Sequence, residues 1–89
     1  MSEKTKNKNL GDTAISVKGI VVPAAWDDQG RPVSLVLETD KETEYLIDTE
    51  DLTGRALFKF MRQNVKITGL SRRSAKNRKM ITVRGFVVV

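Results

Sequence analysis

The densest run of side chains that could bind a ligand lies near the C-terminal end of the chain, between Ser71 and Lys79. Five cations and no acid occur in this run, and they are Arg72, Arg73, Lys76, Arg78 and Lys79. Guanidinium and ammonium groups on a loop suit phosphate oxygens, and the release of counterions makes such contacts favourable and salt-sensitive. The run therefore predicts a phosphate-binding loop. A solvated loop tip, or a partner for the protein's own acidic residues, explains the same composition.

Two aromatic side chains are candidates to stack on a ligand. Trp26, the only tryptophan, falls between Pro23 and Pro32, where the prolines and an Asp-Gln-Gly turn at 28–30 predict a loop. An indole in a loop either stacks on a base or folds back to plug one end of the core. Tyr45 falls in an expected strand, where its ring either stacks or packs in the core with only the hydroxyl in water.

The chain has no histidine and no cysteine, which removes the commonest general base, the commonest metal ligand and any thiolate chemistry. The acids at 27–28 and at 48–51 lack the spacing of a calcium loop, and acids beside a helix start usually serve the helix dipole. The six glycines are spread along the chain, so no phosphate-cradling glycine loop is present. We therefore expect a non-catalytic protein with no metal and no cofactor.

Charge is segregated along the 89 residues, whose net charge is +5. Residues 27–51 hold nine acidic and two basic side chains, net −7, whereas residues 52–89 hold ten basic side chains and no acid, net +10. Residues 1–26 add four lysines and two acids, net +2. Segregation on this scale makes a bipolar molecule unless folding interleaves the two signs.

Apolar periodicity divides the chain into the elements that must position these side chains. Alternation predicts strands over residues 15–22, 33–39, 44–48, 65–70 and 80–89. The first strand is expected to bend at Gly19 and to be buried on both faces after it. In the last strand, Gly85 permits a bulge that turns Phe86 and Val88 inward. Gly30 and Asn77 are the expected positive-φ residues of the two loops.

Residues 54–63 have the 3.6-residue period of an amphipathic helix, with Arg55, Lys59 and Arg62 on its exposed side. Asp51 or Thr53 is the expected N-cap, and Asn64 is expected to close the helix in a left-handed conformation. Residues 1–13 are polar and lack apolar periodicity, which predicts a disordered tail. Residues 14–89 then form one domain, since a chain of this length has nothing left for a second core.

The order of three strands, a helix and two strands resembles a minimal bacterial protein with the oligonucleotide/oligosaccharide-binding (OB) fold. The segments Val17-Lys-Gly-Ile-Val, Val65-Lys-Ile-Thr-Gly-Leu and Ile81-Thr-Val-Arg fall where small OB domains place strands one, four and five. The resemblance covers residues 14–89 and concerns pattern more than residues, so it names a fold and no particular family. It implies an all-β five-stranded barrel with one helix, whose ligands lie across strands two and three between two loops.

The acids count against nucleic acid in the usual OB groove. Glu38 and Glu44 flank the expected hairpin of strands two and three, and carboxylates repel a phosphate backbone. We therefore expect binding of single-stranded or structured RNA or DNA, with low sequence specificity. The expected contacts are the loop at 71–79, Lys66 and the exposed side of the helix at Arg55, Lys59 and Arg62. The alternative is a protein-interaction or assembly module, including a homodimer, in which acidic and basic surfaces dock. The sequence has no signal-peptide core and no membrane-spanning run, which predicts a cytoplasmic protein without membrane contact.

Overall fold

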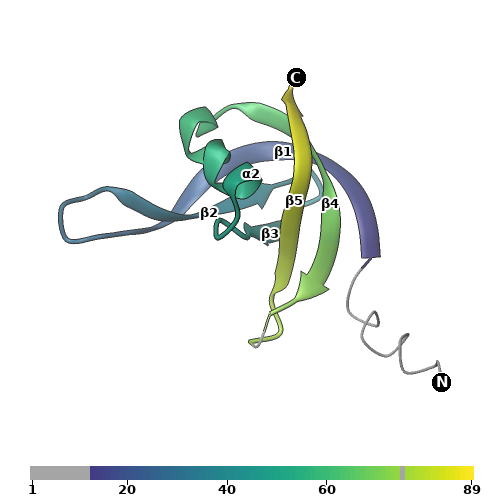
Figure 1. Ribbon diagram of the computed structural model, residues 1–89, viewed down its shortest axis with the longest axis horizontal. Coiled ribbons are helices and arrows are strands. Elements are labelled where there is room, and N and C mark those ends of the chain that lie inside the picture. The colour runs from purple at the N-terminus through teal and green to yellow at the C-terminus, as the bar shows by residue number, and fades with distance from the viewer. Residues whose placement is uncertain (1–12, 75) are drawn as a thin grey trace.

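The computed structural model describes residues 13–74 and 76–89, which form five strands and one helical segment. The strands are β1 (Thr13–Trp26), β2 (Pro32–Glu38), β3 (Glu44–Ile47), β4 (Asn64–Arg73) and β5 (Lys79–Val88). Between β3 and β4, a helical turn α2 (Leu52–Arg55) continues as a 3-10 segment η1 (Ala56–Phe60). The strands close into a barrel in the order β1-β2-β3-β5-β4 (Figure 1). This confirms the predicted all-β class. In the described part of the chain, no helix is long and apolar enough to cross a membrane.

β1 belongs to two pairs of strands. Its residues 13–20 pair with β4, and its residues 20–26 pair with β2. The change of partner occurs beside Gly19, where an added Cβ would overlap the backbone carbonyl oxygen of Glu38. The strand starts earlier than predicted, at Thr13. It also ends later than predicted, because register shifts beyond Pro23 accommodate the proline instead of ending the pairing. Ile20 is 39% exposed, so the prediction that β1 is buried on both faces after its glycine is wrong.

The core is aliphatic and comes mainly from alternate strand residues. Its nine buried side chains are Val21, Leu35, Leu37, Ile47, Leu57, Val65, Ile67, Ile81 and Val83. Leu57 is the contribution of η1, and it anchors the helical segment against the barrel. No polar or charged residue is buried in the described ranges, so the core contains no polar group that needs an internal partner.

The predicted ten-residue helix is wrong in extent, although its N-cap is confirmed. Asp51 accepts a hydrogen bond from the backbone N–H of Gly54 at 3.0 Å, and one α-helical turn follows before the chain tightens into η1. The left-handed residue is Arg62, at φ 68°, and not Asn64, which begins β4. The reason is tertiary: Arg62 and Gln63 already exchange backbone hydrogen bonds with Val21 of β1, so the helical segment must end before them.

The two short hairpins of opposite charge lie at the same end of the barrel. β3 and β5 are parallel, with Leu46 opposite Met80 and Ile47 opposite Ile81, so both strands start from one end. The acidic hairpin (residues 38–44) leads into β3, and the basic hairpin (residues 72–79) leads into β5. Oppositely charged segments that are far apart in the sequence are therefore neighbours in the fold, and the molecule is not divided into two poles.

The predicted bulge in β5 is confirmed. Thr68 lies opposite Gly85 and Gly69 lies opposite Val83, which leaves Arg84 as the extra residue. After the bulge Phe86 packs against the core, and its ring meets Phe60 edge-on with centroids 5.4 Å apart. Val88 was expected to point inward but is 47% exposed, because it lies at the last residue of β5, beyond the buried part of the barrel.

Candidate nucleic-acid interface

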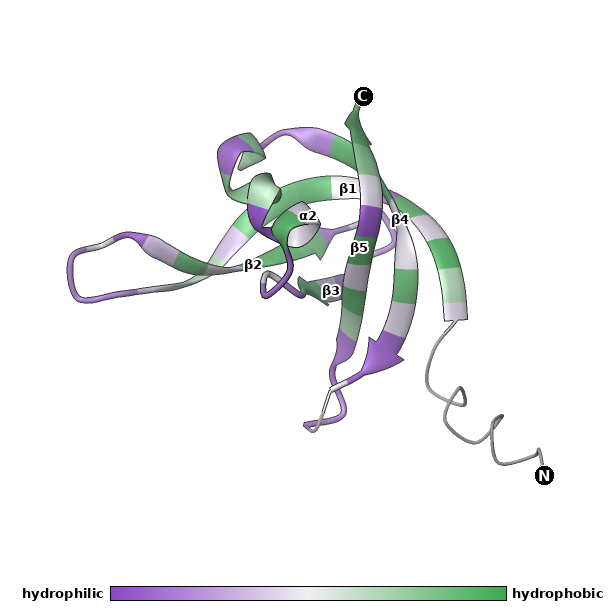
Figure 2. Cartoon of the chain, viewed as in Figure 1, coloured by the Kyte–Doolittle hydropathy of each residue, from purple (hydrophilic) through white to green (hydrophobic). Residues whose placement is uncertain are grey.

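The basic hairpin has a shorter and better defined turn than the sequence suggests. β4 extends to Arg73 and β5 begins at Lys79, so the predicted loop 71–79 is reduced to residues 74–78. The hydroxyl of Ser74 accepts hydrogen bonds from the backbone N–H groups of Lys76 at 3.3 Å and Arg78 at 3.2 Å. Asn77 has a φ of 62°, as predicted. The cations of the turn thus project from a hydrogen-bonded base; Figure 2 shows this hairpin as a hydrophilic end of the barrel.

The five cations of the basic hairpin have different surroundings. A guanidinium nitrogen of Arg72 lies 3.5 Å from a carboxylate oxygen of Asp48, and Arg73 donates to the backbone carbonyl of Asn77 at 3.1 Å. Lys79 places its ammonium 5.9 Å from the centroid of the Tyr45 ring. Of the described cations in this hairpin, only Arg72 is held by a described carboxylate, so one of the five pairs with the protein's own acid.

Lys66 lies on an outward face that β1, β4 and β5 form together. Its register partners are Lys18 on β1 and Val87 on β5, so two lysines stand side by side. Further along the outward side of β4, six residues and roughly 20 Å from Lys66, comes Arg72. We call this surface the β4 face and define it by four exposed cations, which are Lys18, Lys66, Arg72 and Arg84.

The strand segments that build the β4 face contain no acid. Residues 13–20, 64–73 and 79–88 include lysine and arginine but neither aspartate nor glutamate. The β4 face is therefore continuous with the basic hairpin in both position and sign. Lys18 was not a candidate from the sequence, because it reaches Lys66 through a pairing of strands 48 positions apart, and no local signal indicates that pairing.

Trp26 is the last residue of β1 rather than part of a loop, and its pairing partner is Pro32. The residue is 55% exposed, so the interpretation of Trp26 as a plug for the barrel is wrong. Aliphatic side chains fill the core without it. Figure 1 shows that the hairpin joining β1 and β2 projects away from the barrel, apart from the basic hairpin. The ring is open to stacking, but the fold does not bring it to the cluster of cations.

The acid at position 27 builds the tip of this projecting hairpin. One carboxylate oxygen of Asp27 accepts hydrogen bonds from the backbone N–H groups of Gln29 and Arg31, both at 2.9 Å, and the other lies 3.4 Å from the Arg31 guanidinium. Hydrogen bonding from the Arg31 backbone, with smaller contributions from Gln29 and the Arg31 side chain, lowers the pKa of Asp27. Gly30 takes the predicted positive φ, at 80°. Asp27 is thus a turn-forming residue.

Tyr45 is half-buried, with its ring packed against the core and under the ammonium of Lys79. One portion of the ring is therefore covered and the remainder faces a surface cavity, and stacking of Tyr45 on a ligand stays a prediction. On the outward side of β2 and β3, Glu38 stands directly opposite Glu44, and Val36 stands opposite Leu46. That side of the barrel exposes these two carboxylates, whereas Val36 is buried, at 4% exposure.

Comparisons with protein-family models, with curated proteins and with solved structures find no match for this chain. Its function has to be inferred from the placement of its own side chains.

Proposed function

We propose that this chain is a non-catalytic module that binds single-stranded or structured nucleic acid, RNA or DNA, with low sequence specificity. The observation that carries the proposal is the joining of the basic hairpin to the β4 face. Together they form a cationic surface built from strand segments that contain no acid. Lysine and arginine contacts to phosphate supply affinity without reading bases, which is why the expected specificity is low.

We assign the barrel to the OB fold as part of this proposal. The order of three strands, a helical segment and two strands supports the assignment, as does a closed ring in which β3 runs parallel to β5. OB domains commonly bind oligonucleotides, but a fold alone does not specify a ligand. The assignment therefore supports the proposal only alongside the charge distribution.

The proposed path of the nucleic acid follows β4 and does not cross β2 and β3. Glu38 and Glu44 stand opposite each other on the outward side of β2 and β3 and repel phosphates there. Along β4, the Lys18–Lys66 pair lies at one end of the path and the basic hairpin at the other. Tyr45 lies beside the hairpin and offers part of its ring for stacking. Trp26 lies on the projecting hairpin and would reach only a longer strand.

Fluorescence anisotropy with labelled single-stranded RNA and DNA, titrated at several salt concentrations, tests the proposal. The cations on the path that no described carboxylate or ring engages are Lys18, Lys66, Arg73, Lys76, Arg78 and Arg84. Six phosphate contacts on a single strand predict a log–log salt slope of about −4.2. Micromolar binding with that slope supports the proposal. Absence of binding at low salt, or a slope near zero, contradicts it.

The second candidate function is assembly through the charged hairpins. It is favoured by the position of the acidic and basic hairpins at one end of the barrel. Two copies related by a two-fold axis would then place each acidic hairpin against the partner copy's basic hairpin, which gives a closed dimer. Sedimentation at low and high salt tests this candidate. A dimer that dissociates as salt rises supports it, and a monomer at both salt concentrations rules it out.

A further inference from the structure

One edge of the first half of β1 is unoccupied in the described part of the chain. Residues 13–20 pair with β4 on one side, whereas β2 joins the opposite side only from Ile20 onward. Between positions 13 and 19, no described strand or loop makes a backbone hydrogen bond to that second edge. In an antiparallel ladder, alternate residues direct their N–H and C=O groups to opposite sides. About half of the backbone groups in this segment therefore point away from β4 and have no backbone partner among the described residues.

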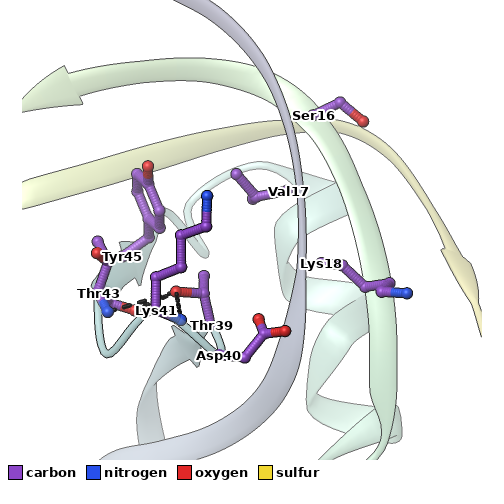
Figure 3. Close-up of a pocket in the computed structure, with 8 residues that line it drawn as sticks. All are labelled: Ser16, Val17, Lys18, Thr39, Asp40, Lys41, Thr43 and Tyr45. Atoms are coloured by element: carbon purple, nitrogen blue, oxygen red, sulfur yellow. Dashed lines mark hydrogen bonds between the residues drawn. The ribbon is translucent and has the colours of Figure 1, made fainter.

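A groove runs along this unoccupied edge. A cavity of about 320 Å³ lies between residues 16–18 and the segment Thr39–Tyr45, and a second of about 240 Å³ continues between residues 18–20 and residues 38–40. The two cavities share Lys18, Thr39 and Asp40 in their lining. Figure 3 shows Val17, Lys41 and Tyr45 turned toward the first cavity, whereas Ser16 and Lys18 turn away from it. We call this feature the β1 groove.

The wall opposite β1 is preformed. The hydroxyl of Thr39 accepts hydrogen bonds from the backbone N–H groups of Lys41 and Thr43, both at 3.3 Å, and donates to the Thr43 carbonyl at 3.1 Å. At the closed end of the groove, the Glu38 carbonyl lies directly against Gly19. From Gly19 to Thr13 the open edge is seven residues long, roughly 23 Å, which matches an extended segment of similar length.

The rim of the β1 groove is acidic. The acidic hairpin that forms the wall opposite β1 carries four exposed carboxylates and one ammonium group, that of Lys41, for a net charge of −3. Glu38 and Asp40 line the groove itself, whereas Glu42 and Glu44 line a neighbouring cavity on the same hairpin. The ion pairs found between described residues involve none of these four carboxylates. The groove therefore combines an unpaired strand edge with negative charge, and it differs from the β4 face in both structure and sign.

We propose that the β1 groove binds an extended, lysine- or arginine-bearing segment of a partner protein. The segment adds to the barrel as a strand, in the position that a longer β2 would have taken. Its backbone pairs with the open edge of residues 13–19, and alternate side chains face either Val17 and Tyr45 or the acidic rim. This interaction is separate from the proposed nucleic-acid function and uses a different surface.

The test uses two fluorescein-labelled heptapeptides, TKVKVKT and TEVEVET, with the full-length protein. We expect the lysine peptide to bind and the glutamate peptide not to bind. Two further lysine peptides are each N-methylated at one of the two alternating sets of residues. Because N-methylation removes the N–H donors needed for strand pairing, at least one of the two should bind at least tenfold more weakly than the unmethylated peptide. Hydrogen exchange with bound peptide should show new protection of backbone amides between residues 13 and 19.

A double variant of the protein separates the groove from general electrostatics. Glu38→Gln with Asp40→Asn should weaken the lysine peptide about three- to tenfold, the range for losing two exposed ion pairs. Asp28→Asn with Glu50→Gln makes the same change in net charge away from the groove, and it should leave the affinity unchanged. Equal losses in the two double variants would overturn the proposal.

Three other results would also overturn it. The first is no binding of the lysine peptide, and the second is that both N-methylated peptides bind as tightly as the unmethylated lysine peptide. The third is protection, before any peptide is added, of those amides in residues 13–19 that do not bond to β4: in a monomer this assigns the groove to the chain itself, and in a dimer to a second copy. Nucleic acid on the β4 face leaves these edge amides unprotected, so the two proposals can fail independently.

Discussion

Neutralising three cations of the basic hairpin gives the sharpest test of how nucleic acid would bind. The variant is Arg73→Gln, Lys76→Gln and Arg78→Gln. These side chains are chosen because, among the described residues, none pairs with a carboxylate, whereas Arg72 is bound to Asp48. Their removal should leave the barrel unchanged, since all three are exposed and none contributes to the core.

The expected size of the effect follows from counting contacts. Each phosphate contact on a single strand contributes about 0.7 to the slope of log K against log salt. Six contacts give about −4.2, and the triple variant, with Lys18, Lys66 and Arg84 remaining, should give about −2.1. At about 0.1 M salt each lost contact costs roughly 0.7 in log K relative to 1 M salt, so the affinity should fall about 100-fold.

Anisotropy with one labelled single-stranded oligomer, measured from low to moderate salt, provides both numbers. A matched control, Lys41→Gln with Lys59→Gln and Arg62→Gln, removes the same charge from positions outside the proposed path. Thermal unfolding of both variants checks that the fold is kept. If the two variants lose affinity equally, net charge alone drives binding and the assignment to the hairpin is refuted. An unchanged slope in the hairpin variant refutes it as well.

Four further predictions concern the barrel and the projecting hairpin. Gly19→Ala should lower the free energy of unfolding by about 1–3 kcal/mol or more in denaturant titrations, because its Cβ would overlap the Glu38 carbonyl; wild-type stability would contradict that close approach. Trp26→Ala should cost less than about 1 kcal/mol, since the residue is 55% exposed, whereas a loss of 3–5 kcal/mol would indicate a buried ring. Asp51→Ala should cost about 1 kcal/mol through loss of the cap to Gly54; an unchanged unfolding midpoint would argue against the cap. Because the folded-state pKa of Asp27 is lowered, its contribution to stability is present above the usual aspartate pKa of about 3.9 and is lost as the pH falls through the lower folded value. NMR titration of the Asp27 carboxylate checks this, and a normal or raised pKa would contradict it.

The strands were predictable because their periodicity reflects burial. Alternation places Leu35, Leu37, Ile67 and Ile81 inward, and all four are buried. The ends of β4 and β5 were less predictable, since Arg72 and Arg73 pair through their backbones with the start of β5 and need no apolar side chain for it. Strand boundaries in polar segments depend on the partner strand, which the local sequence does not contain.

The helical segment and the tryptophan show how tertiary contacts override local pattern. The apolar period of residues 54–63 favours a helix, but it stops early because the Arg62 N–H donates to the Val21 carbonyl and the Val21 N–H donates to the Gln63 carbonyl. The large apolar ring of a tryptophan suits the core of a small domain, yet nine aliphatic residues fill that core without Trp26. For the same reason Lys18 was overlooked, because its neighbour Lys66 arrives through a long-range pairing.

The seam between β3 and β5 has a consequence for how the barrel assembles and fluctuates. It consists of two residue pairs, Leu46 with Met80 and Ile47 with Ile81, whose members are 34 positions apart, whereas β4 and β5 join through a tight turn. Short loops close early and cheaply in entropy, so we expect the seam to form late and to open first in the native state. Opening separates the acidic hairpin from the basic one. Dissolved ions screen the attraction between them, so salt should increase how often the ring opens.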